Sequence, residues 1–258
     1  MYCYLTEFDS SPAIIEPGQL IQPVPGFPRV VIATFTGELL HQLADMPGAR
    51  QIASLHNANT SWPVLALRWN GVEIGVSLAP VGAPTAVGAM EELIAMGARS
   101  LLFFGSCGVL DRKLPDGGIL LPIAALRDEG TSFHYAPPDK EISLAPQGVE
   151  TLEKVLTRMA IPFQKGKVWT TDAFYRETPQ KTAQRKAEGC IAVEMECAAL
   201  TACAAFRQVS FSQFLYAADS LDGEAWDARG LHHKGLHIRD QLLNIALEAA
   251  LELHKQLP

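Results

Sequence analysis

Two carboxylates stand inside an apolar stretch in the last third of the chain. Glu194 and Glu196 flank Met195 within residues 190–206, which are otherwise almost entirely apolar. Burying an unpaired charge costs free energy, so both carboxylates need hydrogen-bond donors or a ligand. A carboxylate in the first turn of a helix can accept both hydroxyls of a ribose while a methionine packs under the sugar. Glu196 is therefore a candidate sugar ligand, and an acid that only favours the helix dipole remains the alternative.

A third carboxylate, Asp219, follows an apolar segment that contains Phe211, Phe214 and Tyr216. A carboxyl group at the end of such a strand can lose its hydration and serve as a general acid. Aspartate is also common in turns and as a helix cap, so that interpretation stays open.

The segment Gly105-Ser106-Cys107-Gly108 follows a short apolar strand and is predicted to be a turn. Its glycines would let backbone N–H groups approach an anion or a flat ring, or they would simply permit a tight turn. The segment lacks the lysine of a P-loop and does not match the Gly-x-Ser-x-Gly pattern of a serine nucleophile.

Aromatic and imidazole side chains give weaker signals. Residues 169–175 could present aromatic faces to a base or form a plain core strand. His233, beside His232, is four residues from His237, as on metal-binding helices, but no acidic third ligand has matching spacing. We therefore predict no metal site and a solvated helix start.

The elements that must position these residues alternate along the chain. Residues 29–35 predict a strand, residues 37–46 a helix, and Asn70-Gly71 a hairpin turn. Further strands are expected at 100–104, 118–124, 167–171, 190–193 and 209–217, and further helices at 84–96, 148–159, 179–188, 195–206 and 236–255. The alternation predicts one α/β domain over residues 1–258, a three-layer α/β/α arrangement around a central twisted mixed sheet. Residues 1–28, with five prolines, predict an extended N-terminal arm.

Composition excludes several classes of protein. Of 258 residues, 48% are hydrophobic and 19% charged, which is enough for a sizeable core and excludes wholesale disorder. A net charge of -7 argues against nucleic acid or an anionic membrane as the main partner, because both need a basic surface. Five cysteines without a CxxC pair, and no signal peptide or membrane span, favour a reducing cytoplasm.

Taken together, these segments resemble the nucleoside phosphorylase family, which includes uridine phosphorylase, hexameric purine nucleoside phosphorylase and the methylthioadenosine nucleosidases. The likeness extends from about Arg29 to the last helix. Its motifs are Gly82-Ala83-Pro84 followed by Glu91-Glu92-Leu93, then Gly105-Ser106-Cys107-Gly108, residues 127–135 in a form like that of uridine phosphorylases, and Val193-Glu194-Met195-Glu196 followed by Ala198-Ala199. The last motif is the most specific, since it is the family's ribose site.

The resemblance implies a role for each matching residue. Glu196, with Glu194 in the same motif, would bind the ribose hydroxyls, and Met195 would lie under the sugar. Phe174 and Tyr175 would pack on the sugar and base.

The remaining matches surround the base and the acceptor. Cys107 and Gly108 would border the base, and Ser106 would face phosphate. Asp219 would protonate or hydrogen-bond N7 of a purine, which favours purines, whereas the segment 127–135 favours uridine. The uracil-reading Gln and Arg of uridine phosphorylases would fall near Thr178 and Gln180, so that specificity is not carried over.

Two phosphate-binding arginines of the family are missing. Phe103 stands two residues before Gly105, where the phosphorylases carry Arg, and residues 35–40 replace their N-terminal arginine loop. Because bidentate arginine is the natural clamp for phosphate, these departures weaken the case for phosphorolysis. Gly37, Arg127 and Arg176 are the remaining candidates for phosphate binding.

Three functions follow as expectations. The first is a nucleoside phosphorylase that cleaves the N-glycosidic bond of a purine or uridine ribonucleoside with phosphate, giving free base and ribose 1-phosphate. The second is a nucleosidase of the same fold that uses water, which Glu38 could help to position. The third is a non-catalytic nucleoside-binding protein. The resemblance also implies a homo-oligomer, dimer or hexamer, and no cofactor besides phosphate as co-substrate.

Overall fold

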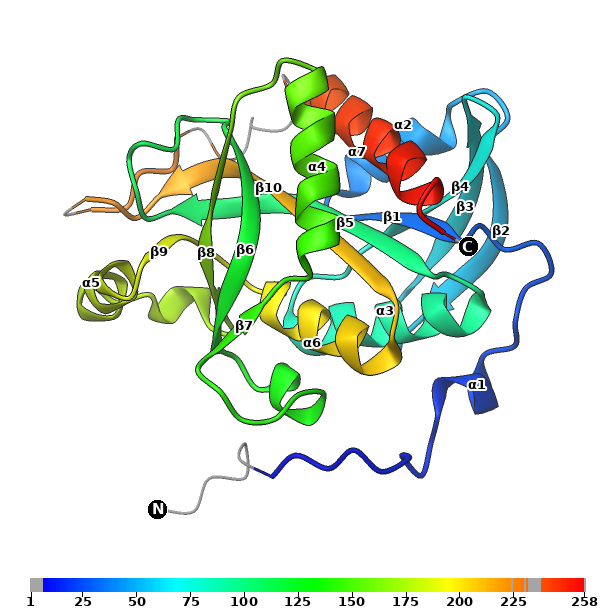
Figure 1. Ribbon diagram of the computed structural model, residues 1–258, viewed down its shortest axis with the longest axis horizontal. Coiled ribbons are helices and arrows are strands. Elements are labelled where there is room, and N and C mark those ends of the chain that lie inside the picture. Colours follow the sequence, from blue (N-terminus) through cyan, green and yellow to red (C-terminus); the bar gives the residue numbers. More distant parts are fainter. Residues whose placement is uncertain (1–6, 224, 230, 232–237, 258) are drawn as a thin grey trace.

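The structure is a computed structural model that describes residues 7–223, 225–229, 231 and 238–257. Within these residues ten strands form one mixed sheet (Figure 1). The strands are β1 (Val30–Thr34), β2 (Arg50–His56), β3 (Ser61–Trp69), β4 (Val72–Leu78), β5 (Ser100–Val109), β6 (Ile119–Asp128), β7 (Glu141–Ser143), β8 (Phe163–Thr171), β9 (Cys190–Glu194) and β10 (Ser210–Ser220). Their order is β10-β6-β8-β9-β5-β1-β4-β3-β2, with β7 paired to β6. Because β10 also pairs with β5, the strands β5, β10, β6, β8 and β9 form a closed circuit of pairings.

Helices cover both faces of this sheet (Figure 1). They are α1 (Pro17–Leu20), α2 (Gly37–Ala44), α3 (Ala83–Met96), α4 (Pro146–Arg158), α5 (Pro179–Ala187), α6 (Cys197–Arg207) and α7 (Arg239–His254), with the 3-10 turns η2 (Thr131–His134) and η3 (Phe174–Arg176). One face packs against α3 and α6, and the other against α2, α4 and α7. The predicted three-layer α/β/α fold around a mixed sheet is confirmed.

Strand β5 lies at the centre and shows how the sequence makes the two layers. Successive side chains of a strand point to opposite faces. Phe103 packs against Phe211, with ring centroids 5.9 Å apart, whereas Phe104 stacks on Phe214 on the other face at 5.0 Å. Both β5 phenylalanines are fully buried.

The predicted turn at residues 105–108 is wrong, because β5 continues to Val109. Its parallel neighbour β10 supplies the hydrogen-bonding partners and pairs Gly108 with Asp219, so Asp219 lies within a strand rather than in a turn after it. Gly105 serves packing rather than a turn: a Cβ there would lie 2.7 Å from Cδ2 of Phe35. The glycine is therefore required because a neighbouring side chain packs closely against the strand, and not because the chain turns there.

Two strands were not expected from the sequence. Strand β2 buries only Leu55 and is an edge strand, so it lacks a hydrophobic pattern. Strand β7 has three residues. The predicted helix at 236–255 begins, in the described chain, at Arg239.

Residues 7–28 of the predicted N-terminal arm run along the outside of the molecule, as Figure 1 shows. It is not wholly extended, since α1 interrupts it. An ion pair of 2.8 Å between Glu16 and Arg207 attaches it to α6.

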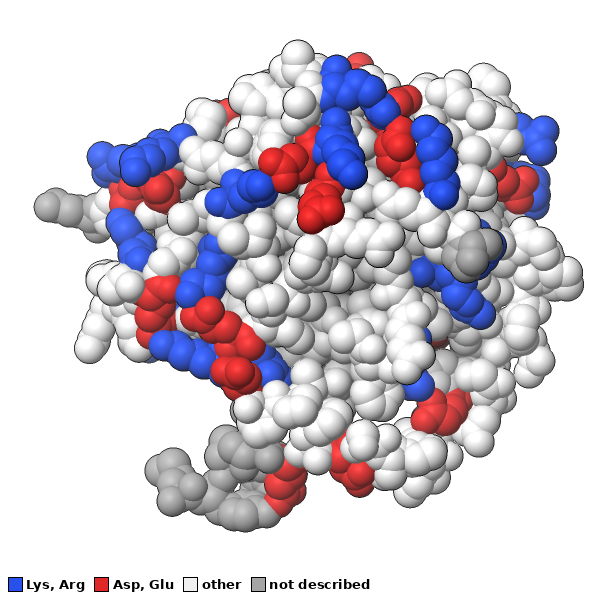
Figure 2. Space-filling model, in the orientation of Figure 1, with Lys and Arg blue, Asp and Glu red and all other residues white. Residues whose placement is uncertain are grey.

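Charged side chains of both signs lie on the surface. Figure 2 shows acidic and basic side chains intermingled on one face rather than gathered into a basic patch. None of the helices in the described part of the chain is long and apolar enough to span a bilayer. Cys107, Cys190, Cys197 and Cys203 are free thiols and buried.

Candidate active site

A cavity of about 690 Å³ opens beyond the ends of β5, β9 and β10. Carboxyl ends of strands are the usual place for ligands in α/β proteins. The cavity brings together most of the residues singled out from the sequence: Ser106, Cys107, Gly108, Phe174, Tyr175, Glu194, Met195, Glu196 and Asp219. Its lining in the described chain also includes residues that sequence reasoning missed: Phe35, Val81, Glu177, Val193, Leu215, Leu221, Trp226 and Leu231.

Glu196 is buried at the start of helix α6, of which it is the N-cap residue. One carboxylate oxygen, Oε1, accepts a hydrogen bond of 2.6 Å from the backbone N–H of Gly82. Burial, and next the charge of Glu194, raise the pKa of Glu196. The Gly82 contact therefore holds the Glu196 side chain at the wall of the cavity, where it can accept hydrogen bonds from a ligand.

Glu194 supports the helix rather than facing the cavity freely. Its Oε1 accepts a hydrogen bond of 2.5 Å from the Thr170 hydroxyl. Its Oε2 accepts the backbone N–H groups of Glu196 and Cys197 at 2.8 and 2.6 Å. Burial raises the pKa of Glu194, and these donors oppose the shift. With both oxygens engaged, Glu194 fixes the first turn of α6 and so fixes Glu196.

Asp219 lies on β10 at an irregularity of the pairing with β5. Its Oδ2 accepts a hydrogen bond of 2.7 Å from the Trp226 indole. The opposing Gly108 keeps the space in front of it open, because a Cβ there would lie 3.4 Å from Asp219 Oδ1 and 2.7 Å from Leu221 Cδ1. The glycine is thus needed for the shape of the cavity.

Cys107 borders the cavity as a neutral thiol. Its Sγ–H donates to the backbone oxygen of Tyr216 at 3.6 Å, and burial strongly raises its pKa. A thiol needs its thiolate form to act as a nucleophile. The environment of Cys107 therefore argues against nucleophilic catalysis and suits contact with a flat ring.

Phe174 and Tyr175 form the turn η3 at the mouth of the cavity, with ring centroids 4.1 Å apart. They are 51% and 87% exposed, so a ligand could cover them. Helix α5 follows directly, and Thr178 caps it by accepting the Lys181 N–H at 3.3 Å.

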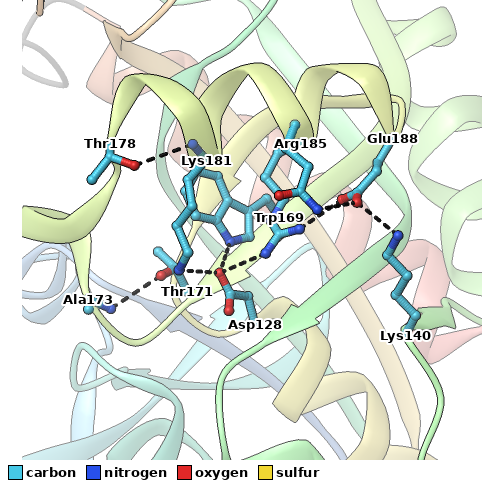
Figure 3. Close-up of polar contacts among 10 residues, drawn as sticks. Asp128, Lys140, Trp169, Thr171, Ala173, Thr178, Lys181, Arg185 and Glu188 are labelled. Carbon is cyan, nitrogen blue, oxygen red and sulfur yellow. Dashed lines mark hydrogen bonds and ion pairs between the residues drawn. The ribbon is translucent and has the colours of Figure 1, made fainter.

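A network under α5 fixes this mouth (Figure 3). Asp128 Oδ2 accepts hydrogen bonds from the Trp169 indole at 2.9 Å, from Lys181 at 2.8 Å and from Arg185 at 3.3 Å. Arg185 also pairs with Glu188 at 2.9 Å. The network joins β6, β8 and α5. It therefore ties α5, which directly follows the aromatic turn η3, to two strands of the sheet.

The candidates for phosphate binding are scattered. Ser106 lines the cavity, whereas Gly37, Arg127 and Arg176 do not. Arg127 is buried and donates to Ser132 Oγ at 2.8 Å and to the backbone oxygens of Pro137 and Ala136 at 2.7 and 3.2 Å. Its guanidinium holds the 127–137 loop together and does not reach the cavity.

Neutral groups adjoin Ser106 and Phe35, two of the residues that line the cavity. The Tyr216 hydroxyl hydrogen-bonds with the side chains of Thr36 and Ser106. Phe103 packs on Phe35, with ring centroids 6.1 Å apart. Four carboxylates line the cavity, those of Glu177, Glu194, Glu196 and Asp219, and no Lys, Arg or His does so among the described residues.

No group of three or more His, Cys, Asp or Glu side chains that could hold a metal ion occurs among the residues that the structure describes. His232, His233 and His237 lie outside the described residues.

Comparison with known proteins decides the family. Residues 29–251 match the family model described as the phosphorylase superfamily. The chain belongs to this superfamily. The match covers most of the chain, including every cavity residue named from the sequence, so the resemblance stated from the motifs is confirmed.

Some curated relatives of this chain are named as phosphorylases of purine nucleosides and others as phosphorylases of uridine. The guanosine phosphorylase of Halorubrum lacusprofundi is 26% identical over 183 residues, 64% of this chain and 73% of the relative. The uridine phosphorylase of Treponema pallidum is 28% identical over 193 residues, 68% and 71% of the two chains. A DeoD-type purine nucleoside phosphorylase of Jannaschia sp. is 28% identical over 189 residues, 70% and 77%.

Solved structures share the fold. The purine nucleoside phosphorylase of Toxoplasma gondii superimposes with a TM-score of 0.75 at 22% identity, covering 93% of this chain and 94% of that one. The AMP nucleosidase of Bacteroides thetaiotaomicron has a TM-score of 0.72 at 19% identity, covering 90% and 91%. The superfamily fold therefore accommodates proteins named phosphorylase and nucleosidase alike.

Proposed function

We propose that this protein cleaves the N-glycosidic bond of a purine ribonucleoside in the cavity between Glu196 and Asp219. The observation that carries the proposal is the buried Glu196 carboxylate, held by Gly82 in the same cavity as Asp219. A ribose bound at Glu196 has its base on the side of Asp219, so one nucleoside spans both groups.

Each group has a chemical task in this proposal. Glu196 accepts the ribose hydroxyls, and Met195 packs against the sugar. Asp219 hydrogen-bonds N7 of the purine, and a proton delivered to N7 makes the base a better leaving group. As the bond to C1′ breaks, positive charge develops on the sugar, and the carboxylates lining the cavity stabilise it.

A purine fits better than a pyrimidine. N7 can take a proton, and a pyrimidine has no equivalent atom for Asp219 to serve. Within the described lining there is no Gln or Arg that could read the two carbonyls of uracil. Arg127, in the segment that resembles uridine phosphorylases, is committed to its own loop.

Water is the acceptor that the described cavity favours. A phosphate dianion would lie beside four carboxyl groups, with no Lys, Arg or His in the described lining to offset its charge. Phe103, which stands at the sequence position of one missing arginine, is fully buried against Phe35 and offers no charge to an anion. Water needs only a hydrogen-bonding partner, and the hydroxyl of Ser106, which lines the cavity, provides one.

Phosphate remains the second candidate, because the three curated relatives described above are named phosphorylases. In that case the cations that hold phosphate come from outside the described lining. A second copy of the chain is one source, since we also propose that the protein is a homo-oligomer. Ile14, Ile15 and Leu20 on the arm are exposed apolar side chains that such a contact would cover. No cofactor is needed in either case.

The test is a product analysis. Phosphate-free enzyme is incubated with inosine, adenosine, guanosine and uridine, with and without added phosphate, and base, ribose and ribose 1-phosphate are quantified. We expect purine base and free ribose at equal rates in both buffers. Ribose 1-phosphate formed only with phosphate supports the second candidate. Tight binding by calorimetry without any base release would instead support a non-catalytic nucleoside-binding protein.

A further inference from the structure

Glu177 is a second carboxyl group at the same end of the cavity as Asp219. It follows η3, is half-buried, and lines the main cavity together with Trp226 and Leu221. The same three residues line an adjoining cavity of about 360 Å³. Glu177 therefore stands between the base end of the main cavity and a further space beyond it.

The cations near Glu177 are engaged elsewhere. Lys181 and Arg185 of α5 bind Asp128, as Figure 3 shows. Lys186, which lines the adjoining cavity, pairs with Asp222. Among the described residues none donates a hydrogen bond to the carboxyl group of Glu177. This group is consequently available to a ligand.

Charge around Glu177 sets its protonation. The groups that face it are Asp219 from β10 and Lys181 and Lys186 from α5. Burial and then the charge of Asp219 raise the pKa of Glu177 to about 7, and the charge of Lys181 opposes them. Glu177 thus changes between a hydrogen-bond donor and a pure acceptor near neutral pH.

Purine geometry supplies the next step. N7 and the substituent at C6 lie on the same edge of the ring system. If Asp219 addresses N7, a second carboxyl group at that end of the cavity faces the 6-substituent. A protonated carboxyl donates to the O6 of hypoxanthine or guanine, whereas a carboxylate accepts from the 6-amino group of adenine.

We propose that Glu177 is a specificity-determining residue that reads the 6-substituent of the purine base beside Asp219. The inference rests on the proposed function and adds the choice between 6-oxo and 6-amino substrates. It predicts that acidic conditions favour inosine and alkaline conditions favour adenosine.

The test uses three substrates that differ only at C6: inosine, adenosine and purine riboside, which carries hydrogen there. In the parent protein the ratio of kcat/KM for adenosine to that for inosine should rise about tenfold or more from pH 5.5 to 8, since a hydrogen bond to a charged group is worth about that factor. In Glu177→Gln the ratio should stay nearly constant over this range, and kcat/KM for purine riboside should fall less than kcat/KM for inosine or adenosine. Glu150→Gln, an exposed position on α4, is the matched control and should behave as the parent.

Two outcomes overturn the inference. One is a parent ratio that does not change with pH, which needs no variant. The other is a Glu177→Gln protein that loses activity equally on all three substrates, because that result indicates a structural role. Failure of the parent to release base from any of the three contradicts the proposed function instead.

Discussion

The backbone N–H of Gly82 donates a hydrogen bond of 2.6 Å to Glu196 Oε1, joining two residues that are 114 positions apart. Gly82 precedes α3 and has a φ of 97°, a conformation that side-chain-bearing residues rarely adopt. The contact ties the start of α3 to the start of α6. It holds the carboxyl group of Glu196 at the wall of the cavity instead of leaving it exposed to solvent.

Glu196→Ala should abolish recognition of the ribose hydroxyls. Losing hydrogen bonds to a charged group should lower kcat/KM for a ribonucleoside by about 100-fold. The matching 2′-deoxyribonucleoside, which offers one hydroxyl fewer, should lose less. Steady-state kinetics on both substrates measure the difference, with Glu150→Ala as the control. Equal losses on both substrates would remove Glu196 from ribose binding.

Asp219→Asn should lower purine release by about two orders of magnitude, the usual scale for loss of a general acid. An activated substrate such as p-nitrophenyl riboside needs no protonation of its leaving group, so its cleavage should change little. Comparing the two substrates separates acid catalysis from distortion of the cavity. If both fall together, Asp219 acts on shape and not on the leaving group.

The buried pair Glu194 and Glu196 should make the ligand-free protein less stable as pH rises. Burial raises the pKa of both groups above the unfolded value of 4.5. Their favourable contribution is therefore complete below that value and is lost as pH rises through the folded pKa values. Thermal unfolding from pH 5 to 8.5 should show a steeper decline in the parent than in Glu196→Gln. Parallel curves for the two proteins would contradict this assignment.

Asp128→Asn should loosen the support of the aromatic turn. Partial burial raises the pKa of Asp128. The hydrogen bond and charge of Lys181, together with hydrogen bonds from Trp169 and Arg185, outweigh burial and hold the pKa below the ordinary value of 3.8. Leaving those donors without a carboxylate should cost about 1–3 kcal/mol in urea unfolding and raise KM. The stabilisation is present above the unfolded pKa, so parent and variant should converge as pH falls below about 4.

The control for that variant is Lys140→Gln. It breaks the outer ion pair with Glu188, in which the lysine side chain is 59% exposed. An exposed pair of this kind should cost less than about 1 kcal/mol. If Lys140→Gln and Asp128→Asn destabilise equally, the inner part of the network has no special role.

The sequence predicts the layered fold well, because buried strands and amphipathic helices carry their own periodicity. It predicts the ends of β5 and β10 poorly, since Gly108 and Asp219 lie opposite each other only after two distant strands pair. Edge strand β2 buries a single side chain, Leu55, so its hydrophobic pattern is weak.

The candidate site likewise contains some residues that the sequence makes recognisable and others that only the folded structure brings in. Glu196 and Asp219 are recognisable because charged residues in apolar surroundings are unusual. Glu177 and Trp226 come from connecting segments whose composition resembles any polar loop, and only the folded chain brings them to Asp219. Arg127 shows the opposite case: an arginine suited to phosphate is used to hold backbone carbonyls together.

Release of free purine base is the measurement that tests the central claim most directly. The parent protein, freed of phosphate, is incubated with inosine and adenosine, and base is followed by chromatography beside the Glu196→Ala and Asp219→Asn variants. The account predicts steady release by the parent and strongly reduced release by both variants. Absence of release by the parent, with phosphate as well as without it, would contradict the account.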